Sequence, residues 1–262
     1  TIEGAIKYRE KIYKAVPSHL NFEPLMTVYL TDETNPKTIR DGYAQGVFAA
    51  AKLYPAGSTT NSNNGVTNID KINHILQIME EIGMPLLVHG EVTDENIDIF
   101  DSETIFIDRI MIPLLKSFTN LKVVFEHLST ADCVGFILSS KQNIGATITA
   151  HHMMINRNAM FDGGIRPHMY CLPVAKRERD RVALRKAATM GSARFFLGTD
   201  SAPHSTKAKE TFCGCAGIFS AVTALEFYVQ VFDEEGALEN LEGFTSKNGA
   251  NFYELPLNSE TI

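Results

Sequence analysis

Short, almost continuously apolar runs alternate with longer amphipathic stretches along the whole chain, and this alternation limits the folds that the chain can adopt. Runs such as Pro85–His89 and Leu121–His127 are typical of strands that are buried on both faces of a parallel sheet. Seven strands are predicted on this basis: Pro24–Leu30, Val47–Tyr54, Pro85–His89, Leu121–His127, Ile144–His151, His168–Leu172 and Arg194–Thr199.

Between these runs, apolar side chains recur with the 3.6-residue period of a helix. Helices are predicted at Ile2–Ala15, Pro36–Gln45, Asn68–Ile82, Ser102–Phe118, Thr130–Ser140, Lys176–Met190 and Gly217–Phe232, with a last one from about Thr245. Strand followed by helix, repeated without a break in composition, predicts βαβ units with right-handed crossovers. We therefore predict a single domain that extends over residues 1–262.

Two α/β architectures fit this pattern, a doubly wound sheet and a (β/α)8 barrel. The chain has 262 residues, which is close to the usual size of one barrel. No G-x-G-x-x-G motif follows the first predicted strands, and this weakens the doubly wound, dinucleotide-binding alternative. The sequence thus favours a TIM-type (β/α)8 barrel.

Composition excludes several classes of function. The 24 Lys and Arg residues against 31 Asp and Glu residues give a net charge of −7, which argues against non-specific binding of nucleic acid. No apolar run reaches the ~18 residues that a membrane-spanning helix needs. The four cysteines are too few for a disulfide framework, so we expect a reducing, cytoplasmic location.

Side chains that can bind metal follow the predicted strands at the ends where an α/β barrel has its active site. They are Lys52, His89, His127, His151 and Asp200. Barrel closure would direct them to one central point, and a buried lysine there is costly unless it is paired or neutralised. Imidazoles and carboxylates gathered at one point predict a divalent-metal site, with zinc the first choice by ligand type.

Longer motifs around these residues resemble those of the dihydroorotases, in the shorter, monofunctional type within the amidohydrolase superfamily. The resemblance rests on KLYPAGSTTNS from Lys52, HGE from His89, EHLST around His127, and LGTDSAPH from Leu197 to His204. GGIRPHMYCLP and CGCAG, which contain Leu172 and Ala216, agree with it. The similarity extends over nearly the whole chain.

The resemblance implies a metal-dependent hydrolase with two Zn²⁺ per chain that interconverts N-carbamoyl-L-aspartate and L-dihydroorotate in pyrimidine biosynthesis. It implies that Lys52 is carboxylated and bridges both metals, and that His89 and His127 ligate the more exposed one. Asp200 would ligate the buried metal and act as general base and acid, with a metal-bound hydroxide as nucleophile. A homodimer is also implied.

For the substrate, the resemblance assigns the ring carboxylate to His204 and the Ala216 backbone, and the pyrimidine edge to the Leu172 backbone. Thr59 and Thr60 lie in Gly57–Asn64, which resembles the family's mobile loop and has the small, polar composition of a lid.

One part of the family pattern is missing. The superfamily has His-x-His at the end of its first barrel strand, and dihydroorotases have an Arg two residues further on. This chain contains no His-x-His, and its first histidine is His19. We therefore expect that the first strand, in roughly the first 50 residues of a typical barrel, is absent, and that the last helix is slightly short. Zinc usually has four ligands, so the chain alone is expected to be nearly inactive.

Two alternative functions stay open at this point. A related cyclic-amide hydrolase, such as a hydantoinase or dihydropyrimidinase, shares the Lys and His ligands. A non-catalytic homologue acting as a scaffold is the alternative from another class.

Four further features are interpreted from the sequence. His151 is expected to pack or to support a ligand, and His168 is a candidate for support of the substrate pocket. The charge run that begins at Lys176 is expected to be a solvated helix face. Lys207 and Lys209 could add positive potential near the barrel mouth.

Overall fold

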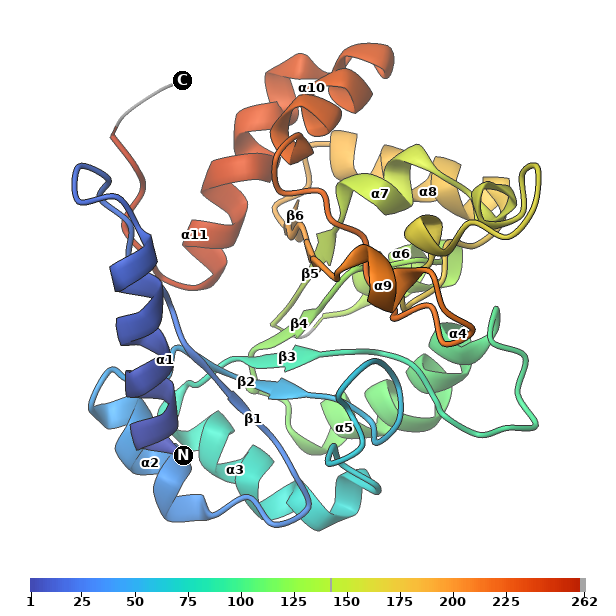
Figure 1. Cartoon of the computed structure of the whole chain (residues 1–262). Helices are drawn as coiled ribbons and strands as arrows, with labels where there is room; N and C mark the ends of the chain where they lie inside the picture. Colours follow the sequence, from blue (N-terminus) through green and yellow to red (C-terminus); the bar gives the residue numbers. More distant parts are fainter. Residues whose placement is uncertain (142, 260–262) are drawn as a thin grey trace.

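The computed structural model of the chain describes residues 1–141 and 143–259 (Figure 1). The described residues form one sheet of six parallel strands in the order β1-β2-β3-β4-β5-β6. The strands are β1 Thr27–Tyr29, β2 Ala50–Leu53, β3 Leu86–Val88, β4 Val123–Phe125, β5 Ile144–Ile148 and β6 Phe195–Leu197. Neighbours in sequence are neighbours in the sheet, as in a barrel and unlike a doubly wound sheet, whose strand order reverses.

Six of the seven predicted strands are confirmed, each shorter than predicted, and the seventh is wrong. The run His168–Leu172 does not pair with the sheet. Its start lies in a 3₁₀ turn, η4 Pro167–Met169, and Tyr170 is extended. Pro167 and Pro173 flank this run, and a proline cannot donate to a strand ladder.

The helices occupy the predicted stretches, with four differences in detail. They are α1 Ile2–Ala15, α2 Pro36–Ala44, η1 Ile69–Ile72, α3 Asn73–Ile82, α4 Ser102–Phe106, α5 Ile112–Ser117, α6 Ala131–Ser139, α7 Ala150–Met154, η3 Arg157–Met160, α8 Glu178–Thr189, α9 Thr206–Lys209, α10 Ala224–Glu234, η5 Leu238–Asn240 and α11 Asn248–Phe252. The π-helical segments η2 Ile107–Met111 and η6 Gly243–Lys247 join α4 to α5 and precede α11.

The four differences have local causes. A 3₁₀ turn begins the Asn68–Ile82 stretch, since Asn68 caps it by accepting from the Asp70 N–H. The predicted helix Ser102–Phe118 contains the π segment, and the short segments α7, η3, α9 and η5 were not predicted. The predicted helix Gly217–Phe232 begins only at Ala224, because Gly217 has a φ of +152° that a helix does not allow.

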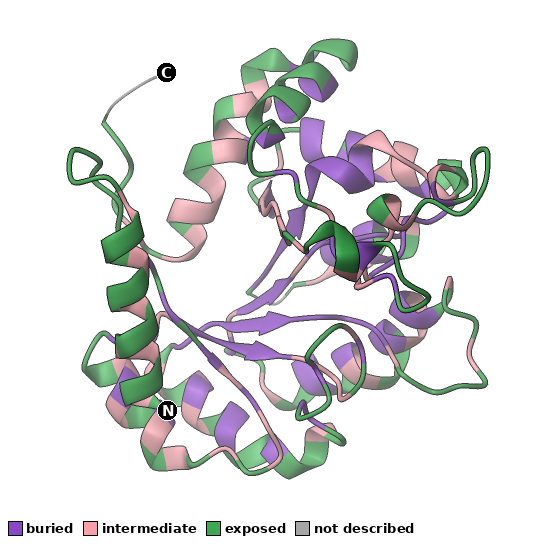
Figure 2. Cartoon of the chain, viewed as in Figure 1, coloured by how far each residue is buried: buried purple, intermediate pink, exposed green. Residues whose placement is uncertain are grey.

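Apolar side chains form two buried groups, one on each side of the sheet. The larger group fills the space between the strands and the surrounding helices, whose outer faces are exposed (Figure 2). The smaller group consists of Ala50, Leu87, Val124 and Phe196, with Phe252 and Tyr253 packed against it. Alternate side chains of a strand share one face, so the smaller group marks the inner face of the barrel.

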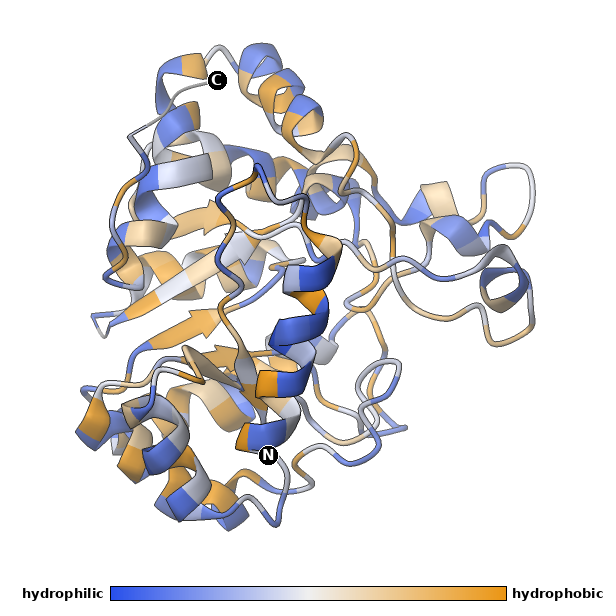
Figure 3. Cartoon of the chain, turned by 60° about the vertical axis from the view of Figure 1, so that its left-hand side comes forward, coloured by the Kyte–Doolittle hydropathy of each residue, from blue (hydrophilic) through white to orange (hydrophobic). Residues whose placement is uncertain are grey.

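Figure 3 shows apolar strands in the interior, whereas α1 has a largely hydrophilic surface. No side chain of α1 is buried, although Ile2, Ala5 and Ile6 pack partly against the core. Among the described residues, none of the helices combines the length and hydropathy that a membrane crossing requires.

Gly90 follows β3 at a place where a side chain has no room. A Cβ built there would lie 1.9 Å from Cζ of Phe125, whose ring packs edge-on against Phe106. We predict that Gly90→Ala lowers the free energy of unfolding by about 1–3 kcal/mol, the usual cost of overpacking a core. Urea unfolding of the protein in the presence of a chelator measures the change.

Gly135 provides the matched control, since it is exposed in α6 and a Cβ there meets nothing within 4 Å. Gly135→Ala should stabilise the protein by about 0.5–1 kcal/mol, because alanine is the better helix former. Equal stability of the two variants would contradict the packing argument.

Candidate functional site

The predicted metal-binding side chains come together at one end of the sheet. Lys52 lies on β2, His89 follows β3 and His127 follows β4, while Asp200 follows β6. All four line one cavity of about 370 Å³. Lys52 and His89 come two positions after the inward-facing Ala50 and Leu87, so strand alternation directs them inward.

The residues predicted to contact substrate are only partly at this cavity. Thr59, Leu172 and Ala216 line it, and Thr60 and His204 are not among the lining residues. His204 is nevertheless adjacent, since its Nε2 donates to the carbonyl oxygen of Ala216 at 3.1 Å.

Lys52 is buried beside Glu126, a carboxylate that the sequence reasoning did not select. The Lys52 Nζ donates to Glu126 Oε2, and it lies 4.7 Å from the ring centroid of Tyr54. Burial acts to lower the pKa of Lys52, but Glu126, Tyr54 and Asp200 outweigh it, so the pKa is raised. Glu126 could have been found from register, because it comes two residues after the inward-facing Val124.

His89 and His127 are buried neutral imidazoles. Their ring centroids lie 4.6 Å apart with the rings edge to face. Burial lowers the pKa of His89 and lowers that of His127 well below its usual value. The His127 Nδ1 is buried and has no hydrogen-bond partner among the described residues. Neutral rings keep a lone pair, which is the form that binds a metal.

Asp200 is the acidic group whose pKa is moved towards neutrality. Burial and the nearby charge of Glu126 raise its pKa to about 7, while Lys52 acts in the opposite direction. Asp200 has a φ of +42° and His127 a φ of +46°, which is the left-handed region that non-glycine residues rarely adopt. The His127 N–H donates to Oγ1 of Thr147 at 2.8 Å, which fixes this turn.

These residues fit a divalent metal. The cavity offers imidazole nitrogens from His89 and His127 and carboxylate oxygens from Asp200 and Glu126, and this mixture suits zinc. The His127 Nδ1 is a buried polar atom without a partner among the described residues. Such a group is costly unless a ligand satisfies it.

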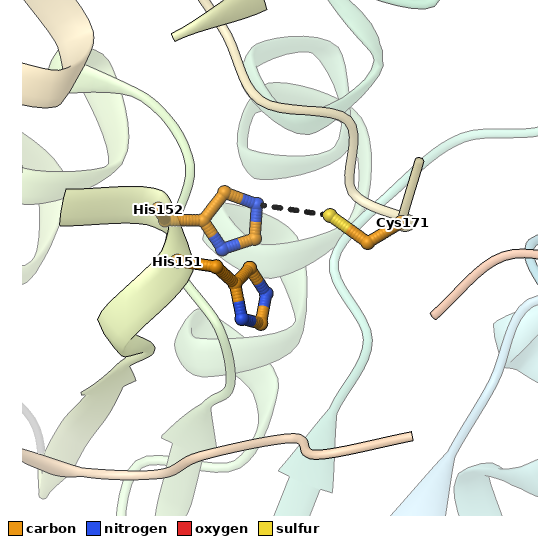
Figure 4. A group of neighbouring side chains, drawn as sticks. All are labelled: His151, His152 and Cys171. Carbon is orange, nitrogen blue, oxygen red and sulfur yellow. Dashed lines mark hydrogen bonds between the residues drawn. The ribbon is translucent and has the colours of Figure 1, made fainter. Parts of the chain in front are cut away.

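A second group of metal-type donors lies beside the first. His151, His152 and Cys171 have ligand atoms within 4.8 Å of one another, and they form the one such triple of His, Cys or acidic residues in the described chain (Figure 4). His151 and His152 project from α7 towards Cys171 on the facing segment. His151 and Cys171 also line the 370 Å³ cavity.

Hydrogen bonding accounts for two members of this second group, His152 and Cys171, without a metal, whereas the His151 Nδ1 is buried and has no partner among the described residues. The His152 Nε2 lies 2.9 Å from the Pro173 carbonyl oxygen, which only accepts, so this nitrogen carries the proton. The His152 Nδ1 is then left to accept from the Thr149 hydroxyl at 2.8 Å. The Cys171 thiol donates to the same Pro173 carbonyl, and burial raises its pKa to about 12. His152 has no lone pair left for a cation, and the protonated thiol of Cys171 is not the thiolate form that binds a metal.

The charge run that begins at Lys176 is not wholly solvated, which corrects the prediction. Lys176 is buried, its Nζ donates to the Val174 carbonyl at 3.1 Å, and it lies 3.9 Å from Glu91 Oε1. Asp180 is also buried, and it caps α8 by accepting from the Arg177 N–H. The i,i+4 pattern could not show that the first residue of the run lies before the helix and turns inward.

Glu91 connects Lys176 to His89. Its Oε2 lies 2.9 Å from the His89 Nε2, and its Oε1 accepts from the Ser102 hydroxyl at 2.7 Å. Burial acts to raise the pKa of Glu91, but His89, Lys176 and Ser102 outweigh it and lower the pKa. An ionised carboxylate only accepts, so the Nε2 of His89 carries the proton and its Nδ1 keeps the lone pair.

Three other sequence interpretations are resolved by the structure. His168 lies on the exposed turn η4, with its Nε2 3.1 Å from Glu210 Oε1, and it is not among the residues that line the cavity. Lys207 is exposed on α9, as a contribution to surface potential requires, but Lys209 is buried.

The sheet and the cavity define a class, the barrel hydrolases that use imidazole and carboxylate ligands. A family comparison agrees with this class, since the amidohydrolase family matches residues 6–262. A dihydroorotase of Sphingopyxis alaskensis is 56% identical over 262 residues, covering all of this chain and 77% of that protein. One of Nitrosomonas eutropha is 57% identical, covering all of this chain and 76% of that protein.

Solved structures agree with these relatives. The dihydroorotase of Saccharomyces cerevisiae, crystallised with 5-fluoroorotic acid, superposes with a TM-score of 0.90 at 34% identity, covering 98% of this chain and 73% of that chain. An L-hydantoinase of Arthrobacter aurescens superposes with a TM-score of 0.81 at 17% identity, covering 97% of this chain and 60% of that one, which shows the shared fold alone. The chain belongs to the amidohydrolase family and, within it, to the dihydroorotases.

The contact between Glu91 and His89 leads to a test in the metal-free protein. We predict that wild-type His89 is a single tautomer with its proton on Nε2, and that Glu91→Gln populates both tautomers, because an amide can accept or donate. Nitrogen-15 NMR of the histidine rings above neutral pH reports the tautomer directly.

Glu103→Gln is the matched control. Glu103 is equally buried, but it accepts from the backbone and hydroxyls of Ser129 and Thr130 rather than from His89. An unchanged His89 tautomer in Glu91→Gln, or the same change in both variants, would contradict the role given to Glu91.

Proposed function

We propose that this protein catalyses the reversible hydrolysis of L-dihydroorotate to N-carbamoyl-L-aspartate, a ring-opening step of pyrimidine synthesis. One observation carries the proposal. Lys52, His89, His127 and Asp200 come from four different strand ends and line one cavity, in a chain that is 56–57% identical to several curated dihydroorotases. In a protein without a metal site, four such side chains from separate strands would not be expected to meet at one point.

The proposal includes two zinc ions, with Lys52 carboxylated and bridging them. His89 and His127 would hold one ion and Asp200 the other. In this proposal, Lys52 would lose a proton to become a neutral amine, which would react with CO2 and release a second proton; the resulting carbamate anion would compensate the cations and replace the pairing of Lys52 with Glu126. When bound, the metals supply Lewis-acid polarisation of the amide carbonyl and acidify water.

Asp200 is proposed as general base and acid. Its carboxylate oxygen would take the proton of the attacking water and deliver it to the departing ring nitrogen. Water, ring and carboxylate must lie within hydrogen-bond reach of one another, which the narrow cavity favours.

For the substrate, we propose that His204 and the Ala216 backbone bind the ring carboxylate and that the Leu172 backbone binds the pyrimidine edge. Leu172 and Ala216 both line the cavity, and His204 is hydrogen-bonded to Ala216. These contacts support a carboxylate-bearing ring over one that lacks the carboxylate.

The segment Gly57–Asn64 is proposed as a lid in which Thr59 and Thr60 reach the substrate. It forms hydrogen-bonded turns, in which the Thr59 N–H donates to the Ser62 hydroxyl at 2.8 Å and that hydroxyl donates to the Thr59 carbonyl at 2.6 Å. Ser62 is therefore a buried polar residue that holds the turn together from within, which composition did not reveal.

The two alternatives predict different outcomes. A hydantoinase or dihydropyrimidinase would prefer hydantoin or dihydrouracil, which lack the ring carboxylate, and a non-catalytic scaffold would bind no zinc. The dihydroorotase proposal is favoured because identity to solved dihydroorotases is 34–35%, whereas it is 12–17% to hydantoinases of similar fold.

The activity test compares Asp200→Asn with the wild type. We predict that the full-length protein opens dihydroorotate far faster than dihydrouracil or hydantoin, and that Asp200→Asn lowers kcat by about 10²–10⁴-fold, the usual contribution of a general base. The absorbance of dihydroorotate measures turnover, and elemental analysis should find about two zinc ions per chain, as expected for the bridged site proposed.

Asp233→Asn, on the exposed face of α10, should leave kcat unchanged. Removal of zinc by a chelator should abolish turnover, and zinc should restore it. Undiminished turnover by Asp200→Asn, or by protein that contains no metal, would overturn the mechanism.

We also propose a cytoplasmic homodimer. The cytoplasmic assignment is supported by four free cysteines, of which Cys133 and Cys171 are buried thiols. The dimer is supported by an apolar stripe on and before α10, where Val222, Leu225 and Val229 are exposed at helical spacing.

The dimer has a direct test. Sedimentation equilibrium should give twice the mass calculated for one chain, and Val222→Asp should reduce it towards the monomer, because a buried charge without a partner is costly. Val222 is 74% exposed, so the substitution should leave the fold intact. A monomeric wild type at micromolar concentration would refute the dimer.

A further inference from the structure

Lys209 ends α9 with its ammonium group buried among backbone carbonyls. Its Nζ donates to the carbonyl oxygens of Tyr170 at 3.0 Å, Cys215 at 2.6 Å and Gly217 at 2.9 Å. These three bonds use all three donors of the ammonium. They connect two segments that are about 45 residues apart in the sequence and that both reach the cavity through Leu172 and Ala216.

The two segments are joined by one more bond, and their backbone has little freedom. The Gly217 N–H donates to the Tyr170 carbonyl at 3.0 Å. Cys215 has a φ of +25° and Gly217 a φ of +152°, and a Cβ on Gly217 would lie 2.9 Å from the His204 Nε2. The Cys215 conformation is strained for a residue with a side chain, so it needs a local force to hold it. The three bonds from Lys209 supply that force.

The charge of Lys209 has no protein counter-ion among the residues that the structure describes. Its partners are neutral carbonyls, and none of the observed ion pairs includes it. The side chain is buried, and burial lowers its pKa, as expected for an ammonium without a carboxylate beside it. An uncompensated positive charge beneath Ala216 and His204 favours an anion in the adjoining cavity.

We propose that Lys209 is a positioning residue for the substrate carboxylate: it ties the Tyr170–Leu172 segment to the Cys215–Gly217 segment, and its charge attracts the anion. The inference rests on the proposed function, because it concerns the ring carboxylate of dihydroorotate. Lys209 itself contacts carbonyl oxygens, so it acts on the substrate through the Ala216 backbone and His204.

The test compares Lys209→Met with the wild type in the zinc-loaded, full-length protein. Methionine keeps the length and apolar stem of lysine but removes the charge and all three donors. We predict that the KM for dihydroorotate is raised about tenfold or more and that kcat changes less than threefold. The expected effect on kcat is small because Lys52, His89, His127 and Asp200 do not belong to the two segments that Lys209 joins.

A binding measurement separates positioning from a general loss of structure. Orotate carries the ring carboxylate and uracil does not. Lys209→Met should weaken the binding of orotate about tenfold and change that of uracil less than twofold, by isothermal titration. Lys209→Arg, which restores the charge and hydrogen-bond donors, should recover part of the orotate affinity.

Lys186→Met is the control, because Lys186 is a lysine exposed on α8 to which no role at the cavity is assigned. It should leave KM and orotate binding unchanged. Equal weakening of orotate and uracil by Lys209→Met would show a structural role only, and unchanged orotate binding would show no role; either result overturns the inference. Failure of the wild type to open dihydroorotate would instead overturn the proposed function.

Discussion

Strand alternation in a parallel sheet is the constraint on which the rest of the structure depends. Ala50, Leu87 and Val124 face inward and fill the interior, and the next inward positions are Lys52, His89 and Glu126. The apolar interior and the polar site are therefore two successive layers of inward-facing side chains on the same strands. A shift of any strand by one residue would turn its polar side chain into the helix layer and expose its apolar one to the cavity. The chemistry of the site is thus inseparable from correct pairing.

Three buried lysines surround this site, and each is accommodated differently. Lys52 pairs with Glu126 inside the cavity, Lys176 lies near Glu91 behind His89, and Lys209 is held by three carbonyl oxygens. Burial of an ammonium costs several kcal/mol unless partners repay it. Glu91 serves two needs at once, because it balances Lys176 and fixes the proton on His89. Lys176 therefore helps to orient His89, because it stabilises the Glu91 carboxylate that is bonded to the His89 ring.

The barrel class and six strands could be predicted, because long apolar runs and period-2 alternation are local signals. Lys52, His89, His127 and Asp200 could be predicted to meet for the same reason, since each directly follows an apolar run. The strand predicted at His168–Leu172 was wrong although the sequence held the signal against it, because the flanking Pro167 and Pro173, which cannot donate to a strand ladder, were not weighed in the prediction. Glu126 could have been found from register, whereas the contacts of Glu91 with Lys176 and of Lys209 with Tyr170 could not be predicted, because these partners are distant in sequence and the contacts depend on side-chain direction.

Backbone strain gathers where function is proposed. His127, Asp200 and Cys215 are non-glycine residues with φ between +25° and +46°, and each lies at or beside the cavity. Such conformations cost about 1–3 kcal/mol apiece and persist only when neighbouring bonds hold them. Thr147 holds His127 through its hydroxyl, and Lys209 holds Cys215 through its carbonyl. Gly198 is required beside Thr147, because a Cβ there would lie 2.6 Å from the Thr147 Cβ. The strained turn at His127 therefore depends on an inward side chain of the sheet, and the one at Cys215 depends on a lysine of α9, so the rigidity of the site follows from both the sheet and the loops above it.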